Sequence, residues 1–394
     1  MKKGWEYKKL GEIGTFVRGG NFSKKDFVED GFPCIHYGQI HMKFGIETLK
    51  HISSVPAEMV KADRCAKKGD LVIAITSEDN AGSCKCTAWM GDYDVYVGGH
   101  TAIYRHTMQP KYVSYYFMSP YFQKDKLEYT HGFKVVEISP KDIAKISIPV
   151  PSLSKQQRIV DYLDSAFSKI DAMKANAEKA LNEAKTLFQA SLKEMLEPKE
   201  GWATSTLKDE CFKITDGTHQ TPKYFQSGYI FLSSKNVTSR KIDWEDVKFI
   251  DESQHQLMHK RVAPQVGDIL LAKNGTTGVA AMVDRDIEFD IYVSLALLRS
   301  RGNVIPEYLL AFVNSPIAKE QFDKRLIGMG VPNLHLGEIN QVVITYPIDK
   351  VEQLKITQRI EELDNLIDRL QANFEKISQE CDALKQAILR QIFE

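Results

Sequence analysis

An internal repeat is the feature that most constrains this chain of 394 residues. When the sequence is shifted against itself by about 197 residues, Gly4-Trp5 aligns with Gly201-Trp202 and Gly69-Asp70 aligns with Gly267-Asp268. Self-similarity at a fixed offset is the signature of a duplicated structural unit. Two copies of one module therefore fill the chain.

Each copy divides into a globular part and a helical part. Residues 1–150 and 201–350 hold short runs of β-branched and aromatic residues, such as 71–75, 94–97 and 287–298, separated by Gly, Asn and Asp. Such runs predict strands of a mixed α and β domain. The segments 151–200 and 351–394 instead read as one helix each, because residues 154–197 and 351–393 contain neither Gly nor Pro.

The two predicted helices carry start signals and an apolar seam. Ser154-x-x-Gln157 and Asp349-x-x-Glu352, each just after a proline, fit capping boxes, and Pro198 ends the first helix. Residues at alternating steps of three and four are typical of a coiled coil. The seam in the second helix is Ile360, Leu363, Ile367, Leu370, Phe374, Ile377, Cys381, Leu384 and Ile388, and in the first it is Leu163, Phe167, Ile170, Lys174, Ala177, Leu181, Ala184, Phe188, Ser191 and Met195.

These patterns predict an α+β (mixed) fold with two globular domains that contain twisted β-sheets. Two long helices, each roughly 65 Å at 1.5 Å per residue, join the domains. The simplest pairing of the helices is an antiparallel coiled coil, which relates the domains by a pseudo-twofold axis. The alternative is that each helix packs separately on its own domain.

Charge and apolar patterning exclude several classes of protein. Lys and Arg total 52, as do Asp and Glu, which excludes a uniformly basic nucleic-acid coat but still allows a locally basic face. No apolar stretch approaches the roughly 18 residues of a membrane span, and the first residues lack the apolar core of a signal peptide. We therefore expect a cytoplasmic protein without a membrane partner.

Metal-binding patterns are weak in this sequence. The six cysteines are dispersed and are expected to be free thiols, and Cys84-x-Cys86 is interpreted as chance spacing because zinc needs two further ligands. His255-x-x-x-His259 lacks the Glu of a zinc protease motif and is predicted to be a solvated helix face. We expect no metal site.

Two related but non-identical domains about a twofold axis suit duplex DNA, which has the same symmetry. Diverged modules would read two different half-sites on opposite strands, separated by an unread spacer. The length of the helices would set that spacer.

Several motifs resemble the specificity (S) subunits of type I restriction-modification systems. They are the start Trp5 to Glu12, the run Asp216-Gly217-Thr218-His219-x-Thr221-Pro222 with Gly228 to Leu232, and Gly132 to Pro151 leading into Gln156-Gln157-Arg158-Ile159. In the second copy Ile348-Asp349-Lys350 departs from the Pro-Ser-Leu of the first.

The resemblance implies a division of labour among subunits. Residues 1–150 and 201–350 would be target recognition domains that read a bipartite site on double-stranded DNA. Residues 151–200 and 351–394 would be the conserved helices that space these domains and dock two methyltransferase (M) subunits, joined by restriction (R) subunits. S-adenosylmethionine, ATP and Mg are expected on those partners, and this chain is expected to be non-catalytic. The sequence carries no methyltransferase motif, no Gly-rich cofactor loop and no Walker A run.

Polar loops after strands are the expected places for DNA contacts, since their side chains bind phosphates and read base edges. In the first domain the candidates are Arg18, Gly20, Lys24, Lys25, Tyr37, Gln39, Thr76, Ser77, Glu78 and Lys134. In the second they are Thr218, His219, Thr221, Ser234, Lys235, Asn236, Lys273, Asn274, Thr276 and Thr277. The loop from Gly132 to Lys134 corresponds to Gly328 to Gly330.

Structural alternatives remain for several of these candidates. Gln39 and Asn236 occupy equivalent positions, where each either bonds adenine or caps a turn. Lys24, Lys25 and Lys235 are alternatively solvated surface charges, Tyr37 a core residue and His219 a residue that orders its own loop.

Two other functions fit the same architecture. One is the specificity subunit of a related system whose partner fuses methyltransferase and nuclease. The other is a coiled-coil scaffold without a DNA role, which predicts no salt-dependent DNA binding.

Overall fold

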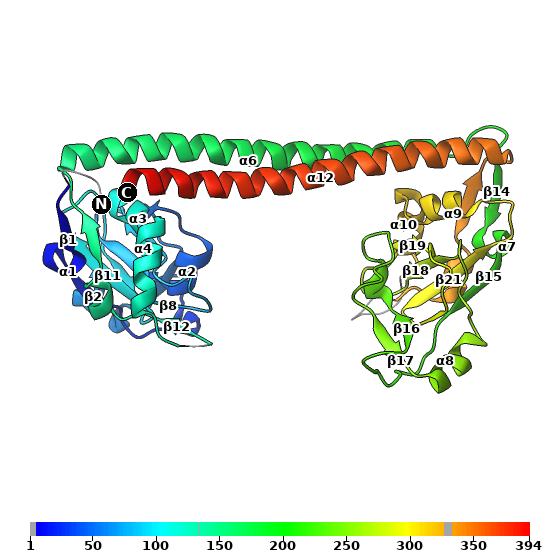
Figure 1. Cartoon of the computed structure of the whole chain (residues 1–394), viewed down its shortest axis with the longest axis horizontal. Helices are drawn as coiled ribbons and strands as arrows, with labels where there is room; N and C mark the ends of the chain where they lie inside the picture. The colour runs from blue at the N-terminus through cyan, green and yellow to red at the C-terminus, as the bar shows by residue number, and fades with distance from the viewer. Residues whose placement is uncertain (1–4, 133, 327–332) are drawn as a thin grey trace. The chain divides into compact units, whose positions relative to one another are not determined.

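The structure is a computed structural model that describes residues 5–132, 134–326 and 333–394 (Figure 1). The chain forms two compact units, residues 1–177 with 375–394 and residues 178–374. Each unit contains one globular domain, here domain 1 (residues 5–150) or domain 2 (residues 201–350), and a part of each long helix. In the described part of the chain, no helix is long and apolar enough to cross a membrane.

Domain 1 contains two main sheets and two short strand pairs. The larger sheet has the order β2 (Gly14–Arg18), β11 (Thr101–His106), β7 (Leu71–Ala74), β9 (Cys86–Trp89) and β4 (Glu47–Thr48). The smaller sheet has the order β5 (Ser53–Val55), β3 (Phe32–Ile35), β10 (Val95–Val97) and β6 (Cys65–Ala66). The strand pairs are β1 (Tyr7–Lys9) with β13 (Ser147–Pro149), and β8 (Thr76–Ser77) with β12 (Val136–Glu137).

Short helices cover the larger sheet of domain 1. They are α1 (Leu10–Ile13), α2 (Tyr37–Met42), α3 (Pro110–Met118), α4 (Pro120–Asp125) and α5 (Pro140–Ile143). Gln109 and Ser119 cap α3 and α4, and each of these helices begins with a proline, whose missing N–H costs nothing in the first turn. The core joins Ile73 and Tyr104 of the sheet to Tyr112 and Phe117 of α3.

Domain 2 repeats this plan. Its larger sheet is β15 (Cys211–Asp216), β21 (Leu295–Ser300), β18 (Ile269–Ala272) and β19 (Ala280–Met282), and its smaller sheet is β17 (Lys248–Ile250), β16 (Tyr229–Leu232) and β20 (Phe289–Ile291). β14 (Ala203–Thr206) pairs with β22 (Val343–Tyr346). The helices are α7 (Leu207–Glu210), α8 (Glu252–His259), α9 (Pro306–Val313), α10 (Pro316–Asp323) and α11 (Leu336–Asn340), with the 3₁₀ turn η5 (Ser234–Val237).

Strand register shows how closely the two copies correspond. Arg18 pairs with Ala102 in β2 and β11, and Asp216 pairs with Ala296 in β15 and β21. In both domains the smaller sheet is built around a parallel pair, β3 with β10 and β16 with β20. The single strand predicted over residues 287–298 is wrong, because the chain turns between β20 and β21, where Leu295 N donates to Tyr292 O at 2.9 Å.

The long helices are α6 (Leu153–Leu196) and α12 (Lys350–Phe393), of 44 residues each. Asp349 caps α12 as predicted, since its Oδ1 accepts from Val351 N at 2.9 Å. The box predicted at Ser154 is wrong, because α6 already begins at Leu153 and Ser152 O accepts from Gln156 N at 2.9 Å. The helix ends before Pro198, as the proline predicted.

The two helices lie side by side and antiparallel within each unit (Figure 1). Lys174 pairs with Asp382 at 3.5 Å in the first unit, and Lys185 Nζ donates to Gln371 Oε1 at 2.8 Å in the second. The antiparallel coiled coil is therefore confirmed. Leu370 and Leu384, predicted in its seam, are instead 40% and 48% exposed.

The seam residues also pack on the domains, so the separate-packing alternative is partly right. Leu163, Phe167 and Ile170 of α6 belong to the core of domain 1. Phe188 of α6 belongs to the core of domain 2, and Ile360, Leu363 and Ile367 of α12 pack against it. Each helix therefore serves two purposes, pairing with the other helix and closing a domain core.

Two buried glutamines join each domain to its helix. Gln156 of α6 accepts from Gln109 N at 2.9 Å and donates to Pro151 O at 2.7 Å. Gln353 of α12 accepts from Ile305 N at 2.9 Å and donates to Pro347 O at 2.8 Å. Each copy thus has a structural reason for the Gln-x-x-Ile run that follows its proline (156–159 and 353–356), because the glutamine satisfies at least two backbone groups at once.

Candidate nucleic-acid interface

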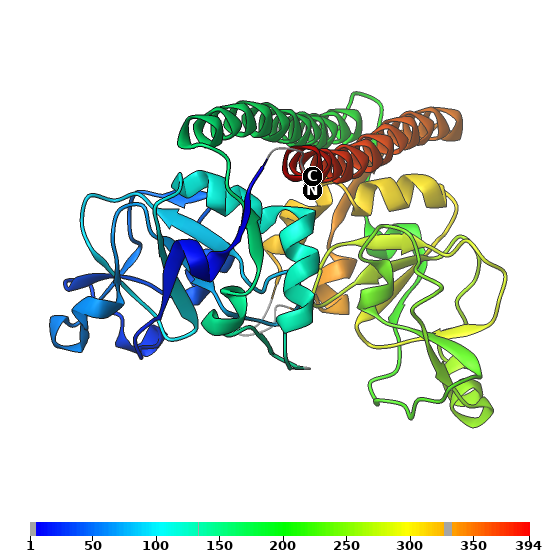
Figure 2. The same cartoon turned by 60° about the vertical axis from the view of Figure 1, so that its left-hand side comes forward.

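The candidates in domain 1 lie mainly on loops that meet at one end of the larger sheet. Thr76 and Ser77 form β8, which pairs with β12 opposite Glu137 and Val136. Arg18, at the end of β2, donates from Nη2 to Glu137 Oε1 at 3.0 Å. In the two views of the chain this β8 and β12 end lies away from the long helices of its unit (Figures 1 and 2).

Two adjoining hollows open beside these loops and share Tyr37 and His100. One, of about 840 Å³, includes Arg18 and Gly20 in its wall, and the other, of about 1580 Å³, includes Thr76, Ser77 and Glu78. The structure thus brings six of the ten candidates of domain 1 to one hollowed surface: Arg18, Gly20, Tyr37, Thr76, Ser77 and Glu78.

Tyr37 is half-buried at the boundary of the two hollows, between two histidine rings. Its ring centroid lies 4.5 Å from that of His36 and 5.2 Å from that of His100. Burial lowers the pKa of His36, and the charges of Lys24 and His100 lower it further. His36 is therefore neutral near pH 7, which leaves its Nδ1 free to accept from Gly38 N at 3.2 Å.

Gln39 and Asn236 occupy the same structural position, and both are turn caps. Gln39 Oε1 accepts from His36 N at 2.9 Å, and Asn236 Oδ1 accepts from Ser233 N at 3.0 Å. Their amide nitrogens donate to Ser53 Oγ at 2.7 Å and to the carbonyl oxygens of residues 243 and 246. The capping alternative is confirmed for both side chains, and contact with adenine stays a prediction.

Gly20 has a packing role of its own. A Cβ atom at this position would overlap the hydroxyl of Tyr96. The loop after β2 therefore passes Tyr96 only with glycine at this position.

Several candidates are exposed charges outside the walls of these hollows. Lys24, Lys25, Lys134 and Lys235 are exposed, so their assignment either to DNA phosphates or to a solvated surface stays open as a prediction. The Gly328 to Gly330 loop, the predicted counterpart of Gly132 to Lys134, lies outside the described residues.

Domain 2 places a buried carboxylate where domain 1 has Arg18. Asp216 Oδ2 accepts from Lys273 Nζ at 2.6 Å, and Asp216 Oδ1 accepts from Arg261 Nη2 at 2.9 Å and lies 3.3 Å from His219 Nε2. Burial by itself would raise the pKa of Asp216, but Lys273 and His219 outweigh burial and hold that pKa below its usual range. Lys273 is buried, so it orders this cluster, and a direct DNA contact stays a prediction.

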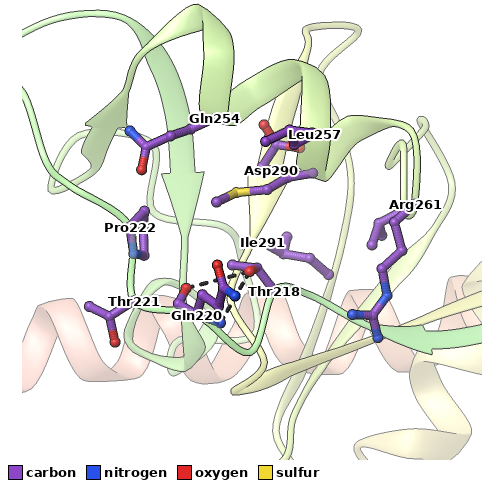
Figure 3. Close-up of a pocket in the computed structure, with 11 residues that line it drawn as sticks. Thr218, Gln220, Thr221, Pro222, Gln254, Leu257, Arg261, Asp290 and Ile291 are labelled. Carbon is purple, nitrogen blue, oxygen red and sulfur yellow. Dashed lines mark hydrogen bonds between the residues drawn. The ribbon is translucent and has the colours of Figure 1, made fainter.

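Thr218 and Thr221 line a hollow of about 220 Å³ between the loop after β15 and helix α8 (Figure 3). Thr221 Oγ1 lies 3.3 Å from the Tyr292 hydroxyl, and the backbone of Thr218 forms a parallel β-bridge with that of Tyr292. Figure 3 shows Arg261 on one side of this hollow and Gln254 and Pro222 on the other. The predicted loop residues and the end of α8 thus form one surface.

The remaining candidates of domain 2 lie on loops that join at β18. Ser234 N donates to Ser294 Oγ at 2.9 Å, and Asn274 forms a bridge to Asn333. Thr276 is exposed, and Thr277 is half-buried. The Asn274 bridge repeats the pairing of Thr76 with Glu137 in domain 1, so the same two loops meet in both domains.

Some residues of these surfaces were missed by the sequence prediction. Glu137 and His100 in domain 1, and Arg261 and Tyr292 in domain 2, come from segments distant in sequence from the predicted loops. Only Glu137 carried a signal, because it lies within the motif from Gly132 to Pro151.

The histidines of α8 contradict their predicted place on a solvated face. His255 is 5% exposed, and its ring stacks on Tyr229 with centroids 3.7 Å apart. Together with His259 and Asp290 it forms a cluster able to hold a metal ion. Cys84 and Cys86, by contrast, are buried free thiols, and burial raises the pKa of Cys84 to about 12.

Comparison with known proteins identifies a family pattern in the first half of the chain. Residues 2–183 match the type I restriction modification DNA specificity domain. The EcoKI specificity subunit of Escherichia coli K12 is 23% identical over 419 aligned residues, which span 100% of this chain and 89% of that protein. The StySPI specificity subunit of Salmonella potsdam is 21% identical, with the same coverage of 100% and 89%.

Solved structures share the fold. A chain from a type I R-M system superposes with a TM-score of 0.78 at 18% identity, covering 100% of this chain and 98% of that one. The HsdS subunit of Thermoanaerobacter tengcongensis gives a TM-score of 0.59 at 17% identity, covering 100% and 97%.

Proposed function

Because the chain belongs to the specificity subunits of type I restriction-modification systems, we propose that domains 1 and 2 each read one half of a bipartite, asymmetric DNA site. The hollowed loop surfaces described above are the proposed reading surfaces. Loops of this kind supply side chains both to phosphates and to base edges.

One observation carries this proposal, namely a shared backbone frame with different side chains at equivalent positions. Arg18 and Asp216 hold the same register in their sheets, but Arg18 is exposed, whereas Asp216 is buried and bound by Arg261 and His219. Tyr37 and Ser234 are also equivalent, because each is the first residue after the N-cap of its helical turn, but their side chains differ. Donors and acceptors that differ in this way discriminate different bases, so the two half-sites should differ in sequence.

The long helices are proposed to space the domains and to dock two methyltransferase subunits. They expose large apolar side chains that pairing leaves uncovered, among them Tyr162, Met173 and Leu187 on α6 and Leu366 and Leu384 on α12. These exposed side chains are the proposed contacts with the methyltransferase subunits. Restriction subunits would join this core.

Catalysis in the assembled complex is proposed to belong to the partners. Binding of S-adenosylmethionine, ATP and Mg would fall to the methyltransferase and restriction subunits, as expected from the resemblance. This chain would supply the DNA sequence preference alone.

The test is a domain exchange in the reconstituted complex. Residues 1–150 are replaced by the corresponding domain of another specificity subunit, and modified bases are mapped across a host genome by long-read sequencing. One half of the recognised sequence should change while the other half and the spacer persist. The matched exchange of residues 201–350 should change the other half, and a change of both halves in either exchange would refute the assignment.

The spacing role has a separate test. One added heptad in α6 between Ala172 and Glu194, with a matching heptad in α12, should lengthen the unread spacer and keep both half-sites. An unchanged spacer would show that the helices do not set it.

A further inference from the structure

Helix α8 and strand β20 place two histidines and a carboxylate together in domain 2. His255 and His259 lie one turn apart on α8, and their ring centroids are 4.8 Å apart. Asp290 of β20 lies with Oδ2 2.7 Å from His255 Nδ1 and with Oδ1 3.7 Å from His259 Nδ1. One ligand atom of each residue lies within 4.8 Å of those of the other two.

This cluster is deeply buried and incompletely satisfied. Asp290 is 1% exposed, yet neither its Oδ1 nor His259 Nδ1 has a hydrogen-bond partner among the described residues. Their separation of 3.7 Å is too long for a hydrogen bond. A buried carboxylate oxygen without a partner is costly, so the geometry calls for another group between these two atoms.

The separations and the chemistry of the donors fit zinc. Zinc binds imidazole nitrogen and carboxylate oxygen at about 2.0–2.2 Å, which places neighbouring ligands of a tetrahedral ion about 3.3–3.6 Å apart. A separation of 3.7 Å between Asp290 Oδ1 and His259 Nδ1 therefore needs only a small adjustment. Histidines four residues apart on one helix face also point toward a common centre.

We propose that His255, His259 and Asp290 bind a zinc ion that fastens α8 to β20. Glu288, whose Oε2 lies 3.4 Å from His255 Nε2, is close enough to support the first histidine from the solvent side. The ion would hold in place the α8 wall of the hollow in Figure 3, to which Gln254 and Leu257 contribute. With three protein ligands, a water molecule would complete the tetrahedron, and the site does not depend on the proposed function.

The experiment measures metal in the full-length chain, purified without a histidine tag. After equilibration with Zn²⁺ and removal of free metal, elemental analysis should give one zinc per chain. The chelator-treated chain with Co²⁺ should show the visible absorption of tetrahedral cobalt, and Zn²⁺ should abolish that absorption. Zn²⁺ should also raise the melting temperature of the chelator-treated chain, because a ligand that binds only the folded state stabilises it.

His259→Ala is the informative variant, since His259 is the most exposed of the three ligands. It should weaken zinc binding by more than about 100-fold, whereas the matched variant His335→Ala, an exposed histidine of the same domain, should bind zinc as the parent chain does. Circular dichroism verifies that both variants are folded. If His259→Ala does not fold, the cobalt spectrum of the parent chain decides.

Three results would overturn the proposal. They are zinc well below one equivalent, the absence of a tetrahedral cobalt spectrum, and equal zinc binding by His259→Ala and His335→Ala. The cluster would then be a buried hydrogen-bonded pair of His255 and Asp290 beside a second histidine.

Discussion

Domains 1 and 2 share a backbone frame but stabilise it with different chemistry. At the end of the larger sheet, Ile75 N donates to His100 O, and the corresponding Lys273 N donates to Ser294 O at 2.8 Å. Domain 1 fills this position with a buried isoleucine and exposes Arg18, whereas domain 2 buries Lys273 against Asp216. A duplicated fold thus keeps its hydrogen-bonded ladders while the side chains under its loops change from apolar to ionic.

The smaller sheets differ in the same direction. Tyr96 of β10 pairs in register with Cys34, inside an apolar cluster that includes Phe22 and Cys65. The equivalent position in β20 is Asp290, which pairs with Phe231 and contacts the histidines of α8. At this position of the smaller sheet, domain 1 therefore has aromatic packing, whereas domain 2 has interacting polar side chains.

Removal of the buried carboxylate of domain 2 is the strongest test of this difference between the domains. Asp216→Ala leaves Lys273 buried without its partner, and we expect a loss of about 3–5 kcal/mol in the free energy of unfolding. The double variant Asp216→Ala with Lys273→Ile, which restores the apolar residue of domain 1, should recover most of that loss. Hydrogen-exchange mass spectrometry of β15 and β21 reports the stability of domain 2 separately from domain 1.

The double variant is also the control for this prediction. A double variant as unstable as Asp216→Ala would mean that Lys273 is not the source of the penalty. Domain 2 would then depend on Asp216 through Arg261 or His219, and the contrast between an apolar and an ionic position would be wrong.

The second prediction concerns a feature that the two domains share. Gln156→Ala removes the partner of two backbone groups and Gln353→Ala that of three, since Gln353 also donates to Asn303 O, so each should cost about 2–3 kcal/mol. Urea denaturation of the full chain measures both losses. Gln157→Ala, at the exposed neighbouring position, should change the free energy of unfolding by less than about 0.5 kcal/mol.

Losses that differ widely between Gln156→Ala and Gln353→Ala would contradict the equivalence of the two joints. Similar losses would place the divergence of the modules in their loops rather than in their attachment to the helices.

Local patterns in the sequence were sufficient for the repeat, the two long helices and the loops that meet at the sheet ends. They were insufficient where a partner is distant along the chain. His255 looked solvated because Asp290, which lies 35 residues away, comes from another element. Lys273 was predicted as a DNA contact, and its burial against Asp216 was missed because Asp216 lies 57 residues earlier.

Periodicity also has limits within the coiled coil. Leu370 and Leu384 keep the spacing of the seam but are exposed. The reason is that both helices bury side chains against the domain cores as well as against each other. A strict heptad assumes one partner surface, and these helices have two.

Low pH should lower the stability of domain 2, by less than the substitutions described above. The pKa of Asp216 is held below its usual range, so its stabilising contribution is fully present above about pH 4 and is lost as pH falls through the lowered value. Domain 2 of the parent chain should lose stability across this window, and the double variant at positions 216 and 273 should lose less. Stability measured against pH by hydrogen exchange in β15 checks this, and parallel curves for the two chains would contradict it.

The smallest effect on stability is expected at the exposed counterpart in domain 1. The Arg18 and Glu137 side chains are 55% and 46% exposed, so Arg18→Ala should change the free energy of unfolding by less than about 0.5 kcal/mol. The same variant should weaken specific DNA binding by the reconstituted complex by about 1–3 kcal/mol if Arg18 reads a base. Lys145→Ala is the matched control, because Lys145 follows α5, pairs with Asp142 and has the same 55% side-chain exposure as Arg18. Equal DNA affinity for the two variants would exclude Arg18 from the reading surface. A large loss of stability in Arg18→Ala would contradict the difference proposed between the exposed Arg18 and the buried Asp216.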